Sequence, residues 1–277
     1  MNIREAILKA TRELRSNNVE DANIIARVLM SYILKQPKEY LIINNKEELK
    51  VKDEQDYFEN IEKVKNGYPI QYITHHQEFM KLDLYVDENV LIPQPDTEIL
   101  VEETLKKCDK FNIKILDLCT GSGAIAVSLA NELKEAIITA SDVNEKALQV
   151  AKKNAKNNNA KIEFIQSNLF ENIENKFDII VSNPPYIESK VIENLSENVK
   201  CEPKLALDGG EDGLYFYRRI ALEAPKFIEK NGYLIMEIGF NQKESVINIL
   251  KENKNYKNIE AVKDLAGNDR VVLAKIV

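Results

Sequence analysis

Hydrophobic residues near the start of the chain recur every three or four positions, with charged residues between them. They are Ile3, Ala6, Ile7, Ala10 and Leu14. This spacing is typical of an amphipathic helix. A second helix is expected after Asp21, a plausible N-cap, and Pro37 should end it. A third is expected over residues 47–66, so residues 1–67 are predicted to form a small helical domain.

The pattern then changes twice along the chain. Residues 68–94 alternate in character and are expected to form a β-hairpin connector, with Asp87-Glu88-Asn89 as its turn. From residue 95 to 277, short apolar strands alternate with helices. The expected helices are 96–107, 123–134, 144–158, 212–230 and 241–252; the expected strands are KILDLC, AIITASD, KIEFIQS, FDIIVSN, GYLIMEIG and RVVLAKIV. This rhythm predicts an α/β fold with a doubly wound, mostly parallel sheet.

Composition narrows the class of protein. The chain has 277 residues, of which 44% are hydrophobic and 30% charged, and no apolar run reaches the length of a membrane span. The first residues lack the apolar segment of a signal peptide, so we expect a cytoplasmic protein. The net charge of −7 disfavours binding to extended nucleic acid duplexes, although it does not exclude a local basic patch. Three scattered cysteines indicate reduced thiols, and two adjacent histidines argue against a metal site.

Polar or glycine-rich segments follow four successive strands. The first is the turn Thr120-Gly121-Ser122-Gly123, the second Asp142, the third Ser167-Asn168-Leu169 and the fourth Asn183-Pro184-Pro185-Tyr186. In parallel sheets, ligands bind at the carboxyl ends of the strands. The glycine turn would let a ligand approach backbone amides, and a carboxylate at position 142 could accept both hydroxyls of a ribose. The four tips together predict a nucleotide-like cofactor site.

Several of these residues also have simpler interpretations. Asp142 could cap the helix that follows it, as could Asn144. Asp117 could orient the glycine turn or merely end a strand. Asp96 is most simply a helix cap, and Glu202 a solvated charge.

The chain resembles the HemK/PrmC family over nearly its full length. The segments that carry the resemblance are PIQYITHHQEF, VLIPQPDTEILVEETL, LDLCTGSGAIAVSLA, FDIIVSNPPYI, EPKLALDGGEDGL and DLAGNDR. That family implies a class I, Rossmann-like methyltransferase that uses S-adenosyl-L-methionine and yields S-adenosyl-L-homocysteine. Its substrate is the side-chain amide nitrogen of the glutamine in the Gly-Gly-Gln motif of peptide-chain release factors, and its methylation modulates translation termination. The helical domain would then recognise the protein substrate.

The resemblance also implies roles for individual residues. The cofactor would be bound by Cys119, Thr120, Gly121, Ser122, Gly123, Asp142, Asn168, Leu169 and Asn183. The substrate amide would be bound by Asn183, Pro184, Pro185 and Tyr186, with Asn183, Pro184 and Tyr186 as the catalytic residues. The chain departs from the usual family pattern at three positions, with Gln94 for arginine, Cys119 for glycine and Asn168 for aspartate.

The motif Asn183-Pro184-Pro185-Tyr186 has a geometric interpretation. Its prolines fix two φ angles and remove two backbone donors, which holds the neighbouring polar atoms still. The Asn183 side-chain oxygen and the Pro184 carbonyl could each accept one hydrogen of a planar NH2 group. The motif alone is compatible with an amino group of adenine or cytosine in RNA or DNA. A catalytically silent cofactor-binding protein is a third possibility, which the intact motif disfavours.

Overall fold

The computed structural model describes all 277 residues, and their contacts divide the chain into two units. The first unit comprises Met1–His75 together with Ser196–Cys201, and the second comprises His76–Leu195 together with Glu202–Val277. The contacts therefore keep residues 68–75 with the helices, whereas the predicted domain boundary was at residue 67. No sequence pattern indicated that a short segment near residue 200 would belong with the N-terminal helices.

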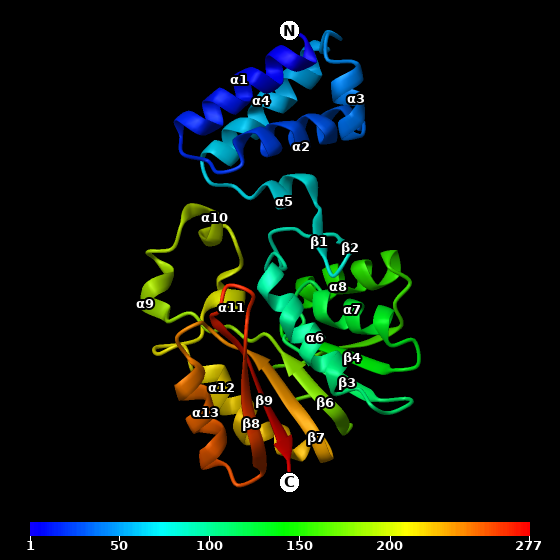
Figure 1. Cartoon of the computed structure of the whole chain (residues 1–277), viewed down its shortest axis with the longest axis vertical. Coiled ribbons are helices and arrows are strands. Elements are labelled where there is room, and N and C mark those ends of the chain that lie inside the picture. The colour runs from blue at the N-terminus through cyan, green and yellow to red at the C-terminus, as the bar shows by residue number, and fades with distance from the viewer. The chain divides into compact units, whose positions relative to one another are not determined.

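The first unit contains a small helical bundle made of α1 (Ile3–Ser16), α2 (Ala22–Leu34), α3 (Lys38–Ile43) and α4 (Val51–Lys65) (Figure 1). The unit also includes the short helices α5 (Ile70–Thr74) and α10 (Glu197–Lys200). Asn2 caps α1 reciprocally with Glu5. Asp21 occupies the N-cap position of α2 as expected, but its side chain makes no capping hydrogen bond. The helix expected over 47–66 begins only at Val51, because residues before it run alongside the N-terminus, where Leu49 N donates to Met1 O over 3.0 Å.

The second unit opens with a short hairpin, β1 (Gln77–Phe79) and β2 (Leu82–Leu84). Its turn is made by Met80 and Lys81, which both have positive φ angles, 49° and 62°. The predicted turn at Asp87-Glu88-Asn89 is therefore misplaced and forms a separate bend after the hairpin. Asparagine and glycine usually mark such hairpin turns, and a methionine-lysine pair gives no such signal.

A seven-stranded mixed sheet forms the body of the second unit, in the order β5-β4-β3-β6-β7-β9-β8. The strands are β3 (Lys114–Leu118), β4 (Ile137–Asp142), β5 (Ile162–Gln166), β6 (Phe177–Ser182), β7 (Ile228–Glu237), β8 (Tyr256–Lys263) and β9 (Asp269–Ile276). Strands β3 to β7 run parallel, and β9 inserts antiparallel between β7 and β8. The doubly wound sheet predicted from the sequence is confirmed.

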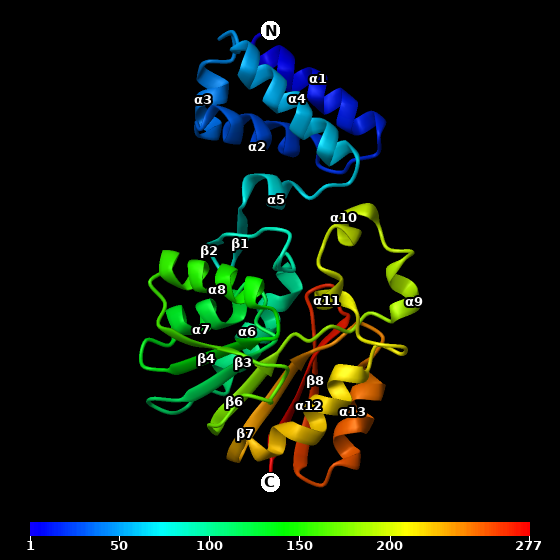
Figure 2. The ribbon, with the colours of Figure 1, turned by 180° about the vertical axis from the view of Figure 1, so that it is seen from behind.

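Helices cover both faces of this sheet (Figures 1 and 2). One face carries α6 (Glu98–Lys106), α7 (Ala124–Glu132) and α8 (Glu145–Asn157), and the other carries α12 (Tyr215–Glu223) and α13 (Lys243–Glu252). Along β3, Ile115 packs in one core and Leu116 in the other, as the two-residue period of a strand requires. Three short elements, η1 (Pro95–Thr97), α9 (Ser189–Ile192) and α11 (Lys204–Leu207), lie in the connections.

Two elements of this unit differ from the prediction. The helix expected over 212–230 ends at Glu223, where a short 3-10 turn containing Pro225 follows and β7 begins at Ile228. Proline cannot continue the helical hydrogen-bond ladder. Strand β8 was not predicted, because it is an edge strand in which only Tyr256 is buried and the other apolar residues are half-buried among exposed polar ones.

Candidate active site

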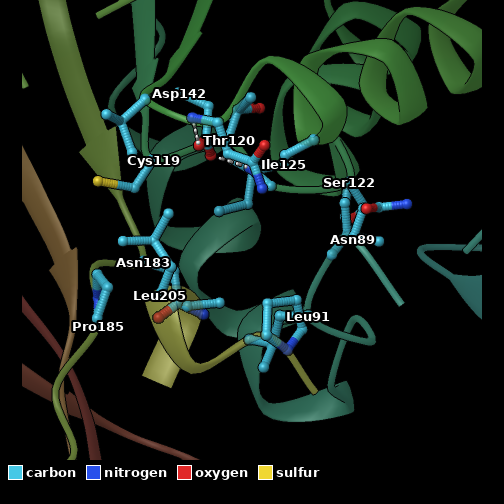
Figure 3. A pocket seen from close by; sticks show the side chains of 18 of the residues that line it. Asn89, Leu91, Cys119, Thr120, Ser122, Ile125, Asp142, Asn183, Pro185 and Leu205 are labelled. Atoms are coloured by element: carbon cyan, nitrogen blue, oxygen red, sulfur yellow. Dashed lines mark hydrogen bonds between the residues drawn. The ribbon is translucent and has the colours of Figure 1, made fainter. Parts of the chain in front are cut away.

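The carboxyl ends of β3, β4, β5 and β6 meet at one edge of the sheet and line a single cavity. Figure 3 shows Cys119, Asp142 and Asn183 around it, each from a different strand end. Of the residues expected to bind the cofactor, all but Gly123 line this cavity. Of the expected substrate residues, the cavity is lined by Asn183 and Pro185. The four tips that the sequence singled out are thus brought together.

The glycine turn after β3 depends on backbone angles that favour glycine. The φ angles of Cys119, Gly121 and Gly123 are 63°, 55° and 81°. A Cβ added at Gly123 would approach the Ala151 Cβ to 3.0 Å, so glycine allows α7 and α8 to pack closely. A Cβ added at Gly121 would meet no protein atom within 4 Å, because this residue borders the open cavity. The turn therefore leaves bare backbone facing the space where a ligand would lie.

The Asp117 carboxylate supports the glycine turn through hydrogen bonds. Its Oδ2 accepts hydrogen bonds from Thr120 Oγ1 at 2.5 Å and from the Ala126 amide at 3.1 Å, while Oδ1 is buried without a partner. Complete burial raises the pKa of Asp117 to about 7. The side chain does not line the cavity. Of the two interpretations left open by the sequence, the structure supports orientation of the turn.

Asp142, at the end of β4, borders the cavity beside this turn. Its Oδ2 accepts from the Gly121 amide and its Oδ1 from the Asn144 amide, both at 2.9 Å. Helix α8 is capped by Asn144, whose Oδ1 accepts from the Lys146 amide, so the capping role falls to Asn144. Burial raises the pKa of Asp142, although the amide donors oppose this. The carboxylate has more lone pairs than these amides occupy, so it could still receive a ligand hydroxyl.

Asn168 follows β5 and lines the cavity, but its amide is engaged. Its Nδ2 donates to Glu171 at 2.7 Å, and its Oδ1 accepts from Arg219 Nη1 at 3.1 Å. An amide oxygen has two lone pairs, so one remains for a ligand. The guanidinium of Arg219 thus lies beside Asn168 at the end of β5.

The segment Asn183-Pro184-Pro185-Tyr186 continues from β6 and is held by contacts along its length. Asn183 Nδ2 donates to Thr97 Oγ1 at 3.3 Å, and the Tyr186 carbonyl accepts from Gln242 Nε2 at 2.9 Å. The Tyr186 hydroxyl reaches Glu237 Oε1 at 3.4 Å, and burial raises the pKa of this phenol. The motif is therefore a fixed part of the fold.

The glycines of LDGGEDGL pack directly against this motif. A Cβ at Gly209 would lie 2.7 Å from the Tyr186 Cα, and one at Gly213 would lie 2.5 Å from the Tyr186 carbonyl oxygen. Hydrogen bonds join the same segments, from the Ile187 amide to Leu207 O and from the Gly209 amide to Ile187 O. These glycines allow one loop to support the other at backbone contact distance.

Two segments of the cavity wall were not among the expected site residues, although Gln94 in the first was expected near the cofactor. They are residues 89–94, after the hairpin, and residues 203–206, in and before α11. Figure 3 shows Leu91 and Leu205 bordering the cavity from these segments. Glu202 connects them, because its Oε2 accepts from the Ile92 amide at 3.2 Å, and burial raises its pKa to about 7. The expectation that Glu202 is a solvated charge is wrong.

The polar residues of the segment after the hairpin also have partners that the sequence did not indicate. Gln94 lines the cavity and turns its Nε2 back to the Ile92 carbonyl at 3.0 Å. The expected cap at Asp96 is wrong, because this carboxylate forms no capping bond and pairs with Arg270 at 2.8 Å.

The residues around the cavity fit S-adenosyl-L-methionine by the chemistry of their donors and acceptors. The bare backbone at Gly121 leaves room for the ligand, the Asp142 carboxylate suits a diol, and leucine and phenylalanine side chains in the wall suit an adenine ring.

No cluster of His, Cys, Asp and Glu is arranged to hold a metal ion. None of the helices combines the length and apolar character that crossing a bilayer requires.

Comparisons with known proteins agree with this site. Residues 5–74 match the PrmC N-terminal domain model, and residues 94–211 match that of the methyltransferase small domain. The chain is 43% identical to a release factor glutamine methyltransferase of Clostridium acetobutylicum, over 99% of this chain and 98% of that protein. It is 38% identical to the enzyme of that name from Moorella thermoacetica, with the same coverage.

The fold is also found among solved structures. A methyltransferase from Pyrococcus furiosus superposes with a TM-score of 0.53 at 21% identity, over 70% of this chain and 88% of that one. This likeness confirms the class I, Rossmann-like methyltransferase fold. The full-length similarity to the two release factor glutamine methyltransferases, with the match to the PrmC N-terminal domain model, shows that the chain belongs to the S-adenosylmethionine-dependent release factor glutamine methyltransferase family.

Proposed function

We propose that this protein transfers a methyl group from S-adenosyl-L-methionine to the glutamine side-chain amide nitrogen in the Gly-Gly-Gln motif of peptide-chain release factors. It would act in the cytoplasm and modulate translation termination. The observation that carries the proposal is the placement of Asn183 at the cavity formed by the β3, β4 and β5 tips. An acceptor for a planar amide thus borders the site that suits the cofactor.

The tips of β3, β4 and β5 would bind the cofactor, and the tip of β6 would bind the substrate amide. The amides and small side chains of residues 119–123 would hold the amino-acid part of the cofactor, and Asp142 would accept its ribose hydroxyls. Asn168 and Leu169 would contact the adenine. When bound, S-adenosyl-L-methionine supplies an electrophilic methyl group on its sulfonium.

The acceptors at the end of β6 would orient the substrate amide. Its nitrogen is a weak nucleophile because the lone pair is delocalised into the carbonyl. Asn183 Oδ1 and the Pro184 carbonyl would each accept one N–H, which directs the nitrogen toward the methyl group and favours the positive charge that develops on it. Orientation of two bound reactants can supply about 7–11 kcal/mol of the barrier.

Asp142, the only carboxylate that lines the cavity, would be taken by the ribose hydroxyls, so none is left to act as a general base at this nitrogen. Glu237 is 2% exposed and does not line the cavity, and the Tyr186 phenol has a raised pKa. We therefore propose that Tyr186 packs its ring against the substrate amide and that the proton leaves to water after transfer.

The N-terminal helical unit would recognise the protein substrate. A complex with a protein needs more contact than one glutamine side chain provides. This unit presents exposed apolar side chains, among them Ile42, Ile43 and Val51.

The proposal is tested with methyl-labelled S-adenosyl-L-methionine and three acceptors. They are a release factor, the same factor with alanine in place of the Gly-Gly-Gln glutamine, and a mixture of RNA and DNA. We expect label on the intact release factor alone. Label on nucleic acid alone would overturn the proposal in favour of a base amino-methyltransferase, and label on the alanine variant would exclude the glutamine as the acceptor.

A further inference from the structure

A buried carboxylate lies behind the substrate-binding motif and has no role in the binding of cofactor or substrate. Glu237 is the last residue of β7, next to β6 in the sheet, and is 2% exposed. Its Oε1 accepts from the Tyr186 hydroxyl at 3.4 Å, while Oε2 has no partner of normal hydrogen-bond geometry. A buried carboxylate oxygen without a donor is costly, so the nearest donor that can rotate should turn to it.

A candidate donor is Thr97, in the 3-10 turn η1. Its side chain is 5% exposed and lies near enough to the Glu237 carboxylate to favour the ionised form, although no hydrogen bond of normal geometry joins the two groups. Arg270 is close enough to stabilise Glu237 electrostatically, but its guanidinium pairs with Asp96 at 2.8 Å and with Asp264 at 3.2 Å. The Thr97 hydroxyl therefore remains the group free to satisfy the ionised carboxylate.

The single proton of this hydroxyl determines what Thr97 can offer to Asn183. A threonine hydroxyl has one hydrogen and two lone pairs, whereas an ionised carboxylate only accepts. If the hydrogen points to Glu237, only a lone pair faces Asn183. The Asn183 amide must then turn its NH2 side to Thr97, which agrees with the Nδ2 to Oγ1 hydrogen bond of 3.3 Å.

The orientation of this amide matters for catalysis because its two ends are chemically opposite. With Nδ2 held by Thr97, Oδ1 is left for the cavity, and no hydrogen bond within the chain uses it. If the amide were reversed, it would present an NH2 group to the NH2 group of the substrate, and the two donors would repel each other.

We propose that Glu237 and Thr97 are positioning residues that fix the Asn183 side-chain amide with its oxygen toward the substrate nitrogen. This inference rests on the proposed function, since it specifies how the acceptor at the end of β6 is oriented. Glu237 acts through Thr97, and Thr97 acts through Asn183. Neither needs to touch the reacting atoms.

The test compares Glu237→Gln, Thr97→Val and Thr97→Ser with the unaltered protein. A glutamine at 237 can donate to Thr97 Oγ1, which frees the hydroxyl hydrogen to turn to Asn183 and favours the reversed amide. Burial raises the pKa of Glu237 to about 7, so the comparison is made above that pH, where the carboxylate is ionised. There we expect Glu237→Gln and Thr97→Val to lower the single-turnover methylation rate about tenfold, the value of one lost hydrogen bond. Thr97→Ser keeps the hydroxyl and should stay within about twofold. KM for the release factor and Kd for the cofactor should not change.

Two further measurements separate positioning from loss of packing. The double variant Thr97→Val with Glu237→Gln should be no slower than either single variant, because both break one chain of hydrogen bonds. Glu103→Gln removes another largely buried carboxylate, which pairs with Lys106 in α6, and should leave the rate unchanged. Additive losses, equal losses in Thr97→Ser, or an unchanged rate in Glu237→Gln would overturn the inference.

A readout without turnover keeps this inference distinct from the proposed function. The Asn183 side-chain NH2 signals, identified by their disappearance in Asn183→Ala, should shift in Glu237→Gln and Thr97→Val but not in Thr97→Ser. Unshifted signals in Glu237→Gln would overturn the positioning role even if the release factor is methylated. Shifted signals would support it even if the true acceptor proves to be another planar amine.

Discussion

The loops after β3 and after β6 are supported in the same way but present different groups to the cavity. Each loop rests on a buried carboxylate with one unpartnered oxygen, Asp117 under the first and Glu237 behind the second. A threonine lies beside each carboxylate. Thr120 donates a hydrogen bond to Asp117, and Thr97 is near enough to Glu237 to lower its pKa. The loop after β3 presents backbone amides to the cavity, and its φ angles determine where they point. The loop after β6 presents the Asn183 side-chain amide, whose orientation depends on the residues around it.

The two supports also differ in how far they reach along the chain. Asp117 and Thr120 are three residues apart, within one strand-turn-helix segment. The contacts around Glu237 join residues that are 51 positions apart, for Tyr186, and 86 positions apart, for Asn183 and Thr97. A locally encoded turn can retain its shape through changes elsewhere, whereas the loop after β6 depends on η1 and β7 being in place.

The largest effect should follow from removing the side-chain acceptor itself. We expect Asn183→Ala to lower the methylation rate about 10²-fold or more, by analogy with other lost electrostatic contacts in active sites. Cofactor affinity should be retained, because the other three strand tips are intact. Single-turnover kinetics with calorimetry of cofactor binding would show this, and normal turnover would contradict the mechanism.

On the cofactor side, Asp142→Ala should act on affinity instead. Loss of hydrogen bonds to a charged carboxylate costs about 1.5–3 kcal/mol, or tenfold or more in Kd. The transfer rate at saturating cofactor should fall much less. Calorimetry checks the first expectation and single-turnover kinetics the second. An unchanged Kd would show that Asp142 serves only the Gly121 and Asn144 amides.

The contrast between the loops explains what the sequence could predict. The glycine turn, Asp142 and the proline-rich motif follow strands directly, so their meeting at one sheet edge follows from parallel topology. The role of Thr97 and Glu237 depends on which strands are neighbours and on side-chain contacts across them. The wall segments 89–94 and 203–206 likewise come from connections without a periodic pattern. Strand β8 was missed because an edge strand needs no apolar run.

The two buried carboxylates, Asp117 and Glu237, should also make the free energy of unfolding depend on pH. Burial raises the pKa of Glu237 from 4.5 to about 7, with Thr97, Arg270 and Tyr186 opposing and Asp96 adding to the shift. Between these values the folded state binds more protons than the unfolded state, so the free energy of unfolding falls as pH rises. The stabilisation is complete below about pH 4.5 and is lost by about pH 7. Asp117 contributes in the same sense, from 3.8 to about 7.

Glu237→Gln removes one of these groups and should flatten the slope by up to about 1.4 kcal/mol per pH unit within this window. Urea unfolding at several pH values, compared with the unaltered protein, would show the difference. An identical slope in the variant would mean that Glu237 is ionised at the same pH in both states.

The smallest effect is expected at Cys119, where the local turn departs from its best residue. Cys119 has a φ of 63°, a conformation that costs a residue with a Cβ about 1–2 kcal/mol. Glycine would relieve this strain. It would also lose more backbone entropy on folding and would lack the contact between the thiol and the core. Cys119→Gly should therefore raise the free energy of unfolding by at most about 1 kcal/mol. Asn112 is a matched control, because it has a φ of 55° and is exposed. Asparagine tolerates this conformation, so Asn112→Gly should gain less. Equal gains at both positions in urea unfolding would show that the cysteine adds no strain of its own to the turn.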